Sequence, residues 1–233
     1  MLANQRRSNN IKTETESLIM AAQEQALNCN SVKKDIYGLK VSDKCRLCGK
    51  NVESITHIVS ACSMLAQRDY KRRHDKVCLN LHWNLCKKYG INVVDKWYQH
   101  KPEAVLENDA VKILWDFSVQ TDRVIEHRRP DIVVVDKAVN KCYIIDVAIP
   151  GDQNLVKKKC EKLNNYAELR LEIARLWNKE TVVVPIIIGA LGSVPKDIHH
   201  YLKLLDIPYQ LNTLQHSALL GTANILRKVL SGK

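Results

Sequence analysis

Four residues of metal-ligand type within 18 positions constrain this chain more than any other feature. Cys45, Cys48, His57 and Cys62 have the spacing C-x2-C-x8-H-x4-C. Two thiolates on one tight turn, one imidazole and one further thiolate complete the tetrahedral shell of a zinc ion and leave no open position. Gly49, directly after Cys48, suits such a turn. We therefore expect a structural zinc knuckle here rather than four ordinary core residues.

The remaining cysteines do not suggest a disulfide framework. The chain has eight cysteines, but its N-terminus lacks the apolar run of a secretory signal. Reduced thiols, some of them metal ligands, are therefore expected. No stretch approaches 18 consecutive apolar residues, so we expect no membrane partner. With 45% apolar and 26% charged residues, the chain has a globular composition.

A second series of possible ligands recurs along one helical face. His74, Cys78, His82 and Cys86 follow one another at intervals of four residues. Successive members lie about 5–6 Å apart on a helix, so no more than two of them can reach one ion. The favoured interpretation is that the cysteines fill a core and that His74 belongs to a basic cluster.

Charge is distributed unevenly along the chain, whose formal net charge is +11. Residues 63–101 carry nine basic and three acidic groups, whereas residues 102–150 carry six basic and nine acidic groups. Basic surface binds phosphates and clustered carboxylates bind divalent cations, so this pattern suits a metal-dependent nuclease. Chance fluctuation of charge is the alternative.

Hydrophobic periodicity predicts a mixed α/β fold. Helical spacing and caps predict helices, while β-branched runs bounded by polar clusters predict strands. The expected helices span 13–27, 63–89, 154–178, 195–205 and 213–230, and the expected strands span 112–119, 131–136, 142–149 and 181–189. Within the helix at 154–178 the predicted apolar stripe comprises Val156, Cys160, Leu163, Ala167, Ala174 and Trp177. Pro185 inside the last strand indicates an edge position or a bulge.

Two aspartates stand out in the predicted hairpin. If Asp136 and Lys141 flank a four-residue loop, Asp131 lies directly opposite Asp146 on the same face of the antiparallel pair. Like charges at directly opposed positions are destabilising, and a divalent cation with oxygen ligands would neutralise them. The alternative, a solvent-exposed strand end, suits Asp131 beside Pro130 but not Asp146 within an apolar run.

These residues resemble a known family. The family is the restriction-like endonuclease of site-specific non-LTR retrotransposons, in which a Cys-Cys-His-Cys knuckle precedes the nuclease. The resemblance extends from about Thr13 to Leu230. It is carried by Arg73-His74-Asp75, Leu114-Trp115-Asp116, Arg129-Pro130-Asp131, Ile145-Asp146-Val147-Ala148-Ile149-Pro150-Gly151-Asp152, Glu161-Lys162 and Tyr166.

The resemblance implies a PD-(D/E)xK nuclease core. It further implies Mg²⁺-dependent nicking of target DNA in the nucleus, after synthesis in the cytoplasm, with the new 3′ hydroxyl priming reverse transcription. Element RNA and the polymerase domain of a parent polyprotein would be further partners. The chain has no Tyr/Phe-x-Asp-Asp polymerase motif, so we expect a C-terminal piece of such a polyprotein, a degenerate copy or a derived host gene.

The expected regions are an N-terminal helical segment at 1–44, the knuckle at 45–62, a basic helical linker at 63–103 and a restriction-like endonuclease domain at 104–233. Asp131 and Asp146 would hold the catalytic Mg²⁺. The residues expected to contact nucleic acid are Arg68, Lys71, Arg72, Arg73, His74, Lys76 and Arg129. The alternative function is a catalytically inactive or domesticated zinc-dependent nucleic-acid-binding module.

One departure from the family concerns the catalytic lysine. The lysine of the D-x-K pattern would be residue 148, which is Ala148. The helix expected at 154–178 must pack back over the sheet, and Lys159, Lys162 and Tyr166 share one of its faces. The position that matches Lys162 in the retrotransposon nucleases is also a lysine, with a tyrosine four residues further on. We predict that Lys162 supplies the charge, with Lys159 as the second candidate and Tyr166 hydrogen-bonding nearby. Solvated helix lysines are the alternative.

Overall fold

A computed structural model describes residues 11–231, and the first ten residues of the segment predicted at 1–44 lie outside this range, as do residues 232–233. The fold is mixed α/β, as predicted, around one five-stranded sheet in the order β1-β2-β3-β4-β5. Neighbouring strands are antiparallel from β1 to β4, and β5 is parallel to β4. The strands are β1 (Val105–Glu107), β2 (Val111–Trp115), β3 (Ile132–Asp136), β4 (Lys141–Ala148) and β5 (Glu180–Ile187).

The register of the central hairpin is the predicted one. Ile132 pairs with Ile145, and Asp136 pairs with Lys141 across a four-residue loop. Continued by one residue, this register sets Asp131 opposite Asp146, although Asp131 lies just before the first residue of β3. The first strand, β1, was not predicted, because three residues are too few to show an alternating pattern.

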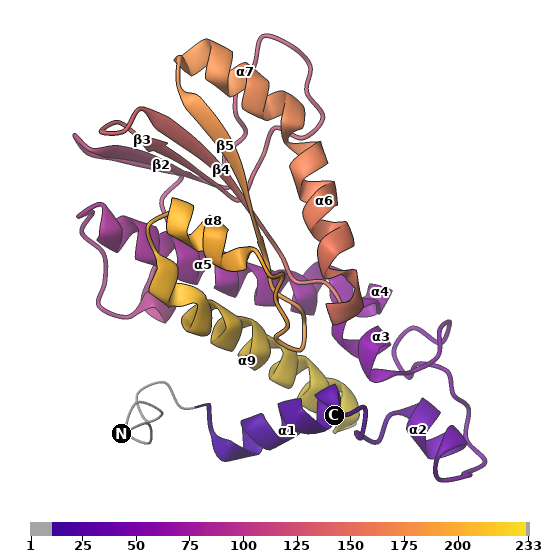
Figure 1. Ribbon diagram of the computed structural model, residues 1–233. Helices are drawn as coiled ribbons and strands as arrows, with labels where there is room; N and C mark the ends of the chain where they lie inside the picture. The colour runs from indigo at the N-terminus through magenta and orange to yellow at the C-terminus, as the bar shows by residue number, and fades with distance from the viewer. Residues whose placement is uncertain (1–10, 232–233) are drawn as a thin grey trace.

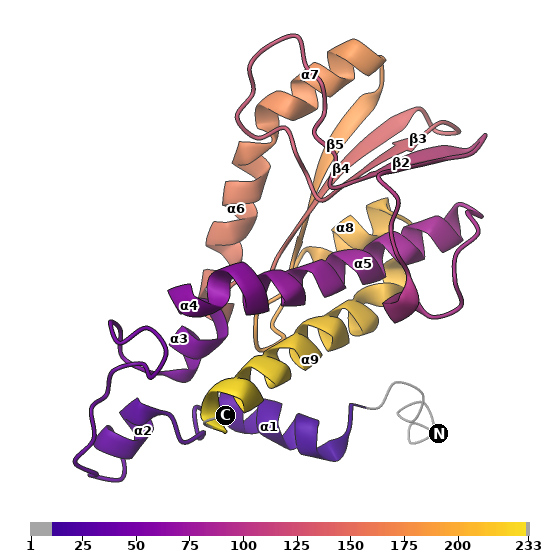
Figure 2. The ribbon, with the colours of Figure 1, turned by 180° about the vertical axis from the view of Figure 1, so that it is seen from behind.

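Helices cover both faces of the sheet (Figures 1 and 2). One face packs against α5 (Lys71–Lys88), α8 (Ile198–Leu204) and α9 (Leu211–Leu230). The other face packs against α7 (Ala167–Trp177), which continues from α6 (Leu155–Asn165). Val77, Leu81 and Leu85, spaced four residues apart along α5, are fully buried. The segment 63–103, expected as a linker, therefore supplies one wall of the core.

The helix predicted at 154–178 is interrupted at Tyr166, which turns its ring into the protein. The predicted apolar stripe is wrong in its first half, because Val156 and Cys160 are exposed and α6 buries no residue. The second half buries Leu169 and Ile173 instead, on the same face as Tyr166.

Strand β5 confirms the prediction made from Pro185. Among the described strands β5 pairs with β4 alone, so it is an edge strand, where the missing N–H of proline costs no ladder bond. Pro185 pairs with Asp146. The apolar run of β5 is buried apart from its first residues.

The N-terminal region forms a second apolar cluster against the far end of α9. It contains α1 (Thr13–Gln23), α2 (Asn30–Asp35), α3 (Ile55–Ser60) and α4 (Ser63–Leu65), and a π-helical turn at Ala66–Tyr70 leads into α5. Figure 1 shows α1 lying beside α9, and α3 and α4 near the base of α6. None of the helices within residues 11–231 has the length and apolar character needed to cross a bilayer.

Candidate functional site

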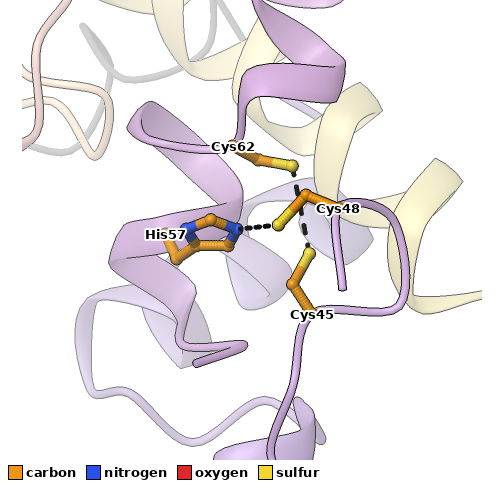
Figure 3. A group of neighbouring side chains, drawn as sticks. All are labelled: Cys45, Cys48, His57 and Cys62. Carbon is orange, nitrogen blue, oxygen red and sulfur yellow. Dashed lines mark hydrogen bonds between the residues drawn. The ribbon is translucent and has the colours of Figure 1, made fainter. Parts of the chain in front are cut away.

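The four knuckle residues converge on one point (Figure 3). The Sγ atoms of Cys45 and Cys62 are 3.9 Å apart, and Cys48 Sγ lies 3.4 Å from His57 Nε2. All four ligand atoms lie within 4.8 Å of one another. This group can hold a metal ion, and three thiolates with one imidazole are compatible with zinc.

The local backbone prepares the knuckle for a metal. Gly49 has a φ of +65°, a left-handed conformation that favours glycine, and its N–H donates to the carbonyl of Cys45. The backbone N–H groups of Asn51 and Lys50 lower the pKa of Cys48 to about 6, which favours the thiolate at neutral pH. The turn that holds Cys45 and Cys48 is therefore formed in this structure, and the lowered pKa of Cys48 favours the thiolate that a metal binds.

The second series of ligands divides into two groups in space, so no more than two of its members reach one point, as predicted. His82 and Cys86 lie with His100, which comes from the loop after α5, and all three are buried. His82 Nδ1 and His100 Nε2 are 2.8 Å apart, so the two rings form a hydrogen-bonded pair inside the core. His74 and Cys78 lie instead with Asp131.

The two aspartates occupy different environments at the end of the hairpin. Asp146 is 3% exposed, whereas the side chain of Asp131 remains 21% exposed. Asp131 Oδ2 accepts a hydrogen bond of 2.7 Å from the backbone N–H of Val147. Burial, and next the negative charge of Asp131, raise the pKa of Asp146 above its ordinary value. The hairpin thus concentrates negative charge where β3 begins and β4 ends.

Helix α6 brings one lysine to Asp146, and the break after α6 brings a tyrosine. Lys162 Nζ lies 2.6 Å from Asp146 Oδ2, and the Tyr166 hydroxyl donates to Asp146 Oδ1 at 2.7 Å. Burial lowers the pKa of Lys162, but the attraction of Asp146 outweighs it and leaves the pKa raised. Lys159 does not join this group, because its ammonium pairs with Asp197 at 2.8 Å. The lysine beside the second acid therefore comes from α6 and not from position 148.

His74 also lies beside Asp131. The sequence analysis assigned His74 to the basic cluster and did not predict this contact. Its Nε2 lies 3.2 Å from Asp131 Oδ2 and 3.1 Å from the carbonyl oxygen of Val147. Burial lowers the pKa of His74, but hydrogen bonding and attraction to Asp131 outweigh this and raise it to about 9. The adjacent Asp75, whose Oδ1 lies 3.2 Å from Nδ1, was a sequence signal for an oriented imidazole.

Arg73 corrects the list of expected nucleic-acid contacts. Its side chain is 2% exposed, so it cannot contact phosphates in this structure. The guanidinium donates to the carbonyls of Val59 and Ile149 and to the hydroxyl of Thr222. Gly221 leaves the space through which the Arg73 side chain passes, since a Cβ there would overlap it. Arg73 therefore joins the knuckle, α9 and the end of β4.

The other basic residues of the cluster remain on the surface. Arg68, Lys71 and Arg72 are exposed and Lys76 is half-buried. Arg129 is exposed as well, and its guanidinium forms a two-bond ion pair with Asp116. A groove of about 320 Å³ lies beside Lys71 of this cluster, and neither Asp131 nor Asp146 is among its lining residues. Its lining includes Lys71, His74, Val147, Ala148, Lys158 and Lys162.

The comparisons with known proteins assign no family. The chain matches no protein-family model and no curated protein. A functional assignment therefore rests on the geometry of the two sites and on the chemistry of their residues.

Proposed function

We propose that this protein is a divalent-cation-dependent endonuclease that hydrolyses phosphodiester bonds in DNA. The observation that carries the proposal is the ion pair between Lys162 and Asp146, at the end of the strand pair where Asp131 stands opposite. The order of elements is a helix, four antiparallel strands, a helical crossover and a parallel strand. Two acids and one ammonium lie at one end of this sheet, and the combination supports a PD-(D/E)xK nuclease. The family resemblance supports the same proposal.

The residues present fit a divalent cation. Asp146 Oδ2 is buried, and its partner among the described residues is the Lys162 ammonium at 2.6 Å. Carboxylate oxygens are the ligands that Mg²⁺ prefers, and Asp131 and Asp146 would hold it. Such an ion supplies positive charge for the scissile phosphate and lowers the pKa of a bound water.

Side chains of the protein would stabilise the developing charge, orient the carboxylate and position the nucleic acid. Lys162 would stabilise negative charge developing on the phosphate, and Tyr166 would hold the Asp146 carboxylate in its orientation. The zinc knuckle and the exposed basic cluster would position nucleic acid, mainly through its phosphates. Nicking of target DNA in the nucleus to prime reverse transcription, with element RNA and a linked polymerase as partners, is the biological setting we propose.

Plasmid nicking tests the proposal. With Mg²⁺, the protein should convert supercoiled plasmid to open circles, and EDTA should abolish this conversion. Asp131→Ala and Asp146→Ala should each lower the rate at least about 10²-fold, because each removes a carboxylate from the charged centre. Asp109→Asn, an exposed aspartate distant in sequence, is the matched control. Saturable DNA binding without nicking in any divalent metal would favour the non-catalytic binding module.

The exposed basic cluster gives a separate prediction about affinity. Replacing Arg68, Lys71 and Arg72 together should weaken binding to all DNA sequences alike, because phosphate contacts carry no base information. The slope of log affinity against log salt concentration should flatten by about three units. Titrations of labelled duplex at several salt concentrations measure this slope. An unchanged slope would mean that the cluster is an ordinary solvated surface.

A further inference from the structure

The groove beside Lys71 is lined by basic side chains and by no acidic one. The basic side chains come from the first turn of α5 and from α6, and they are Lys71, Arg73, His74, Lys158 and Lys162. Among the described residues no aspartate or glutamate lines this groove. A hollow whose walls carry one sign of charge concentrates ligands of the opposite sign, so the groove favours an anion.

Arg73 is a buried cation whose hydrogen-bond partners are all neutral. Its side chain is 2% exposed, and its guanidinium donates to two carbonyls and one hydroxyl. Its Nε is buried and has no hydrogen-bond partner among the described residues. Burial lowers the pKa of Arg73 to about 10, so the group is still charged at neutral pH. A buried charge without compensation is costly, and an anion in the adjoining groove would offset that cost.

Two lysines of the groove can reach an incoming anion. Lys71 is exposed, and Lys158 forms a partly exposed ion pair with Glu161 at 2.8 Å. Because such surface pairs are worth little, an anion can share the Lys158 ammonium. Lys162 also lines the groove, and its Nζ lies 2.6 Å from Asp146, which does not. An anion in the groove would therefore lie beside the proposed nuclease centre and outside it.

We infer that this groove binds a phosphate group of a nucleic-acid strand, separate from the phosphate that is cleaved. The inference rests on the proposed function for the source of the phosphate, and it adds a second point at which the strand is held. Lys71 and Lys158 would donate charge-assisted hydrogen bonds, and the Arg73 guanidinium would attract the phosphate from the buried side. The phosphate is either a diester within the strand or a monoester at its end.

Nuclear magnetic resonance of the Arg73 side chain tests the site without any measurement of cleavage. The protein is labelled with ¹³C,¹⁵N-arginine, its knuckle is loaded with zinc, and no other divalent cation is added. Inorganic phosphate is the probe, with the ionic strength held constant by NaCl. The Nε–H signal of Arg73, assigned through its side-chain carbons, should shift with phosphate concentration until the site is saturated.

Lys71→Gln and Lys158→Gln should each weaken phosphate binding about threefold, and together about tenfold, because each removes one partly exposed charge. Lys203→Gln, which replaces an exposed lysine on α8 outside the groove, is the matched control and should leave the binding unchanged. An Arg73 signal that does not shift, or phosphate binding that the two substitutions leave unaltered, would overturn the inference. Either result would leave the nuclease proposal standing.

Competition by one short single-stranded oligonucleotide distinguishes the two sources of phosphate. The oligonucleotide is prepared with a 5′-phosphate, with a 3′-phosphate and with neither. Equal displacement of inorganic phosphate by all three would identify a diester within the strand, whereas stronger displacement by one phosphorylated form would identify a strand end. Failure of all three to displace it would overturn the assignment to nucleic acid. Displacement by a protein that nicks no plasmid would overturn the nuclease proposal alone.

Discussion

Lys162→Ala is expected to reduce plasmid nicking by about 10²–10³-fold, because it removes the ammonium 2.6 Å from Asp146. DNA affinity and zinc content should remain close to those of the wild-type protein, since Lys162 is not one of the four knuckle ligands and the substitution leaves Arg68, Lys71 and Arg72 in place. Single-turnover nicking rates at saturating protein measure the effect.

Lys159→Ala is the matched control for this prediction. Both lysines lie on α6, both have side chains 21% exposed, and both form an ion pair with one aspartate. They differ in the aspartate, which is Asp197 for Lys159 and Asp146 for Lys162. Nicking at the wild-type rate by Lys162→Ala would show that the assignment is wrong.

A stability measurement separates catalysis from folding in this experiment. Removing Lys162 leaves the buried Asp146 carboxylate without its counter-charge, which in buried pairs costs on the order of 3 kcal/mol. The thermal midpoint of Lys162→Ala should therefore fall, and rates should be compared well below it. The double variant Asp146→Asn with Lys162→Ala should recover part of the lost stability and none of the nicking.

Cys48→Ser is expected to abolish zinc binding at the knuckle. The wild-type knuckle should hold about one zinc per chain, and the variant about none, because three remaining ligands leave a structural site incomplete. In small metal sites the binding free energy of the metal contributes to folding, so the variant should also become open to proteolysis within residues 45–62. Elemental analysis and limited digestion measure the two effects.

Cys160→Ser is the control for the zinc prediction, since Cys160 is an exposed thiol on α6 and belongs to none of the ligand groups. It should keep its zinc and its resistance to protease. A wild-type protein that is fully folded and protected at residues 45–62 after complete removal of zinc would contradict the prediction.

The hairpin and the knuckle were predictable from local sequence for physical reasons. A side-chain period of two fixes which residues face each other once the loop length is known, so the register followed from Asp136 and Lys141. The knuckle was predictable because four ligand-type residues lie within 18 positions, and so short a segment has few ways to place all four around one ion. Helix α5 followed from the spacing of its buried residues.

The burial of Arg73 was not predicted, although one signal was available. Arg73 precedes Val77 by four residues and so continues the buried stripe of α5 toward its N-terminus. The count of basic residues drew attention to the neighbours Arg72 and Lys71, which point outward. The Arg73 side chain fits only because Gly221, 148 positions further along the chain, has no Cβ. The local sequence around Arg73 does not reveal this space.

The contacts of His74 lay beyond local reasoning for a similar reason. Its partners are Asp131, just before β3, and Val147 in β4, and their approach depends on where the first turns of α5 lie relative to the sheet. The break at Tyr166 was not predicted, although the pair Asn164 and Asn165 before it, with low helix propensity, was a weak local signal. At that break the Tyr166 hydroxyl donates a hydrogen bond to Asp146, a tertiary contact that local sequence does not show.

Arg73 limits how this chain can be recombined with others. Its guanidinium links the carbonyl of Val59 in the knuckle region to that of Ile149 beside the nuclease centre. A foreign knuckle grafted onto this nuclease would have to present a carbonyl at the same point, or the buried cation would lose a partner. The two parts are therefore expected to be inherited and exchanged as one unit, and a productive fusion junction would lie before the knuckle and not after it.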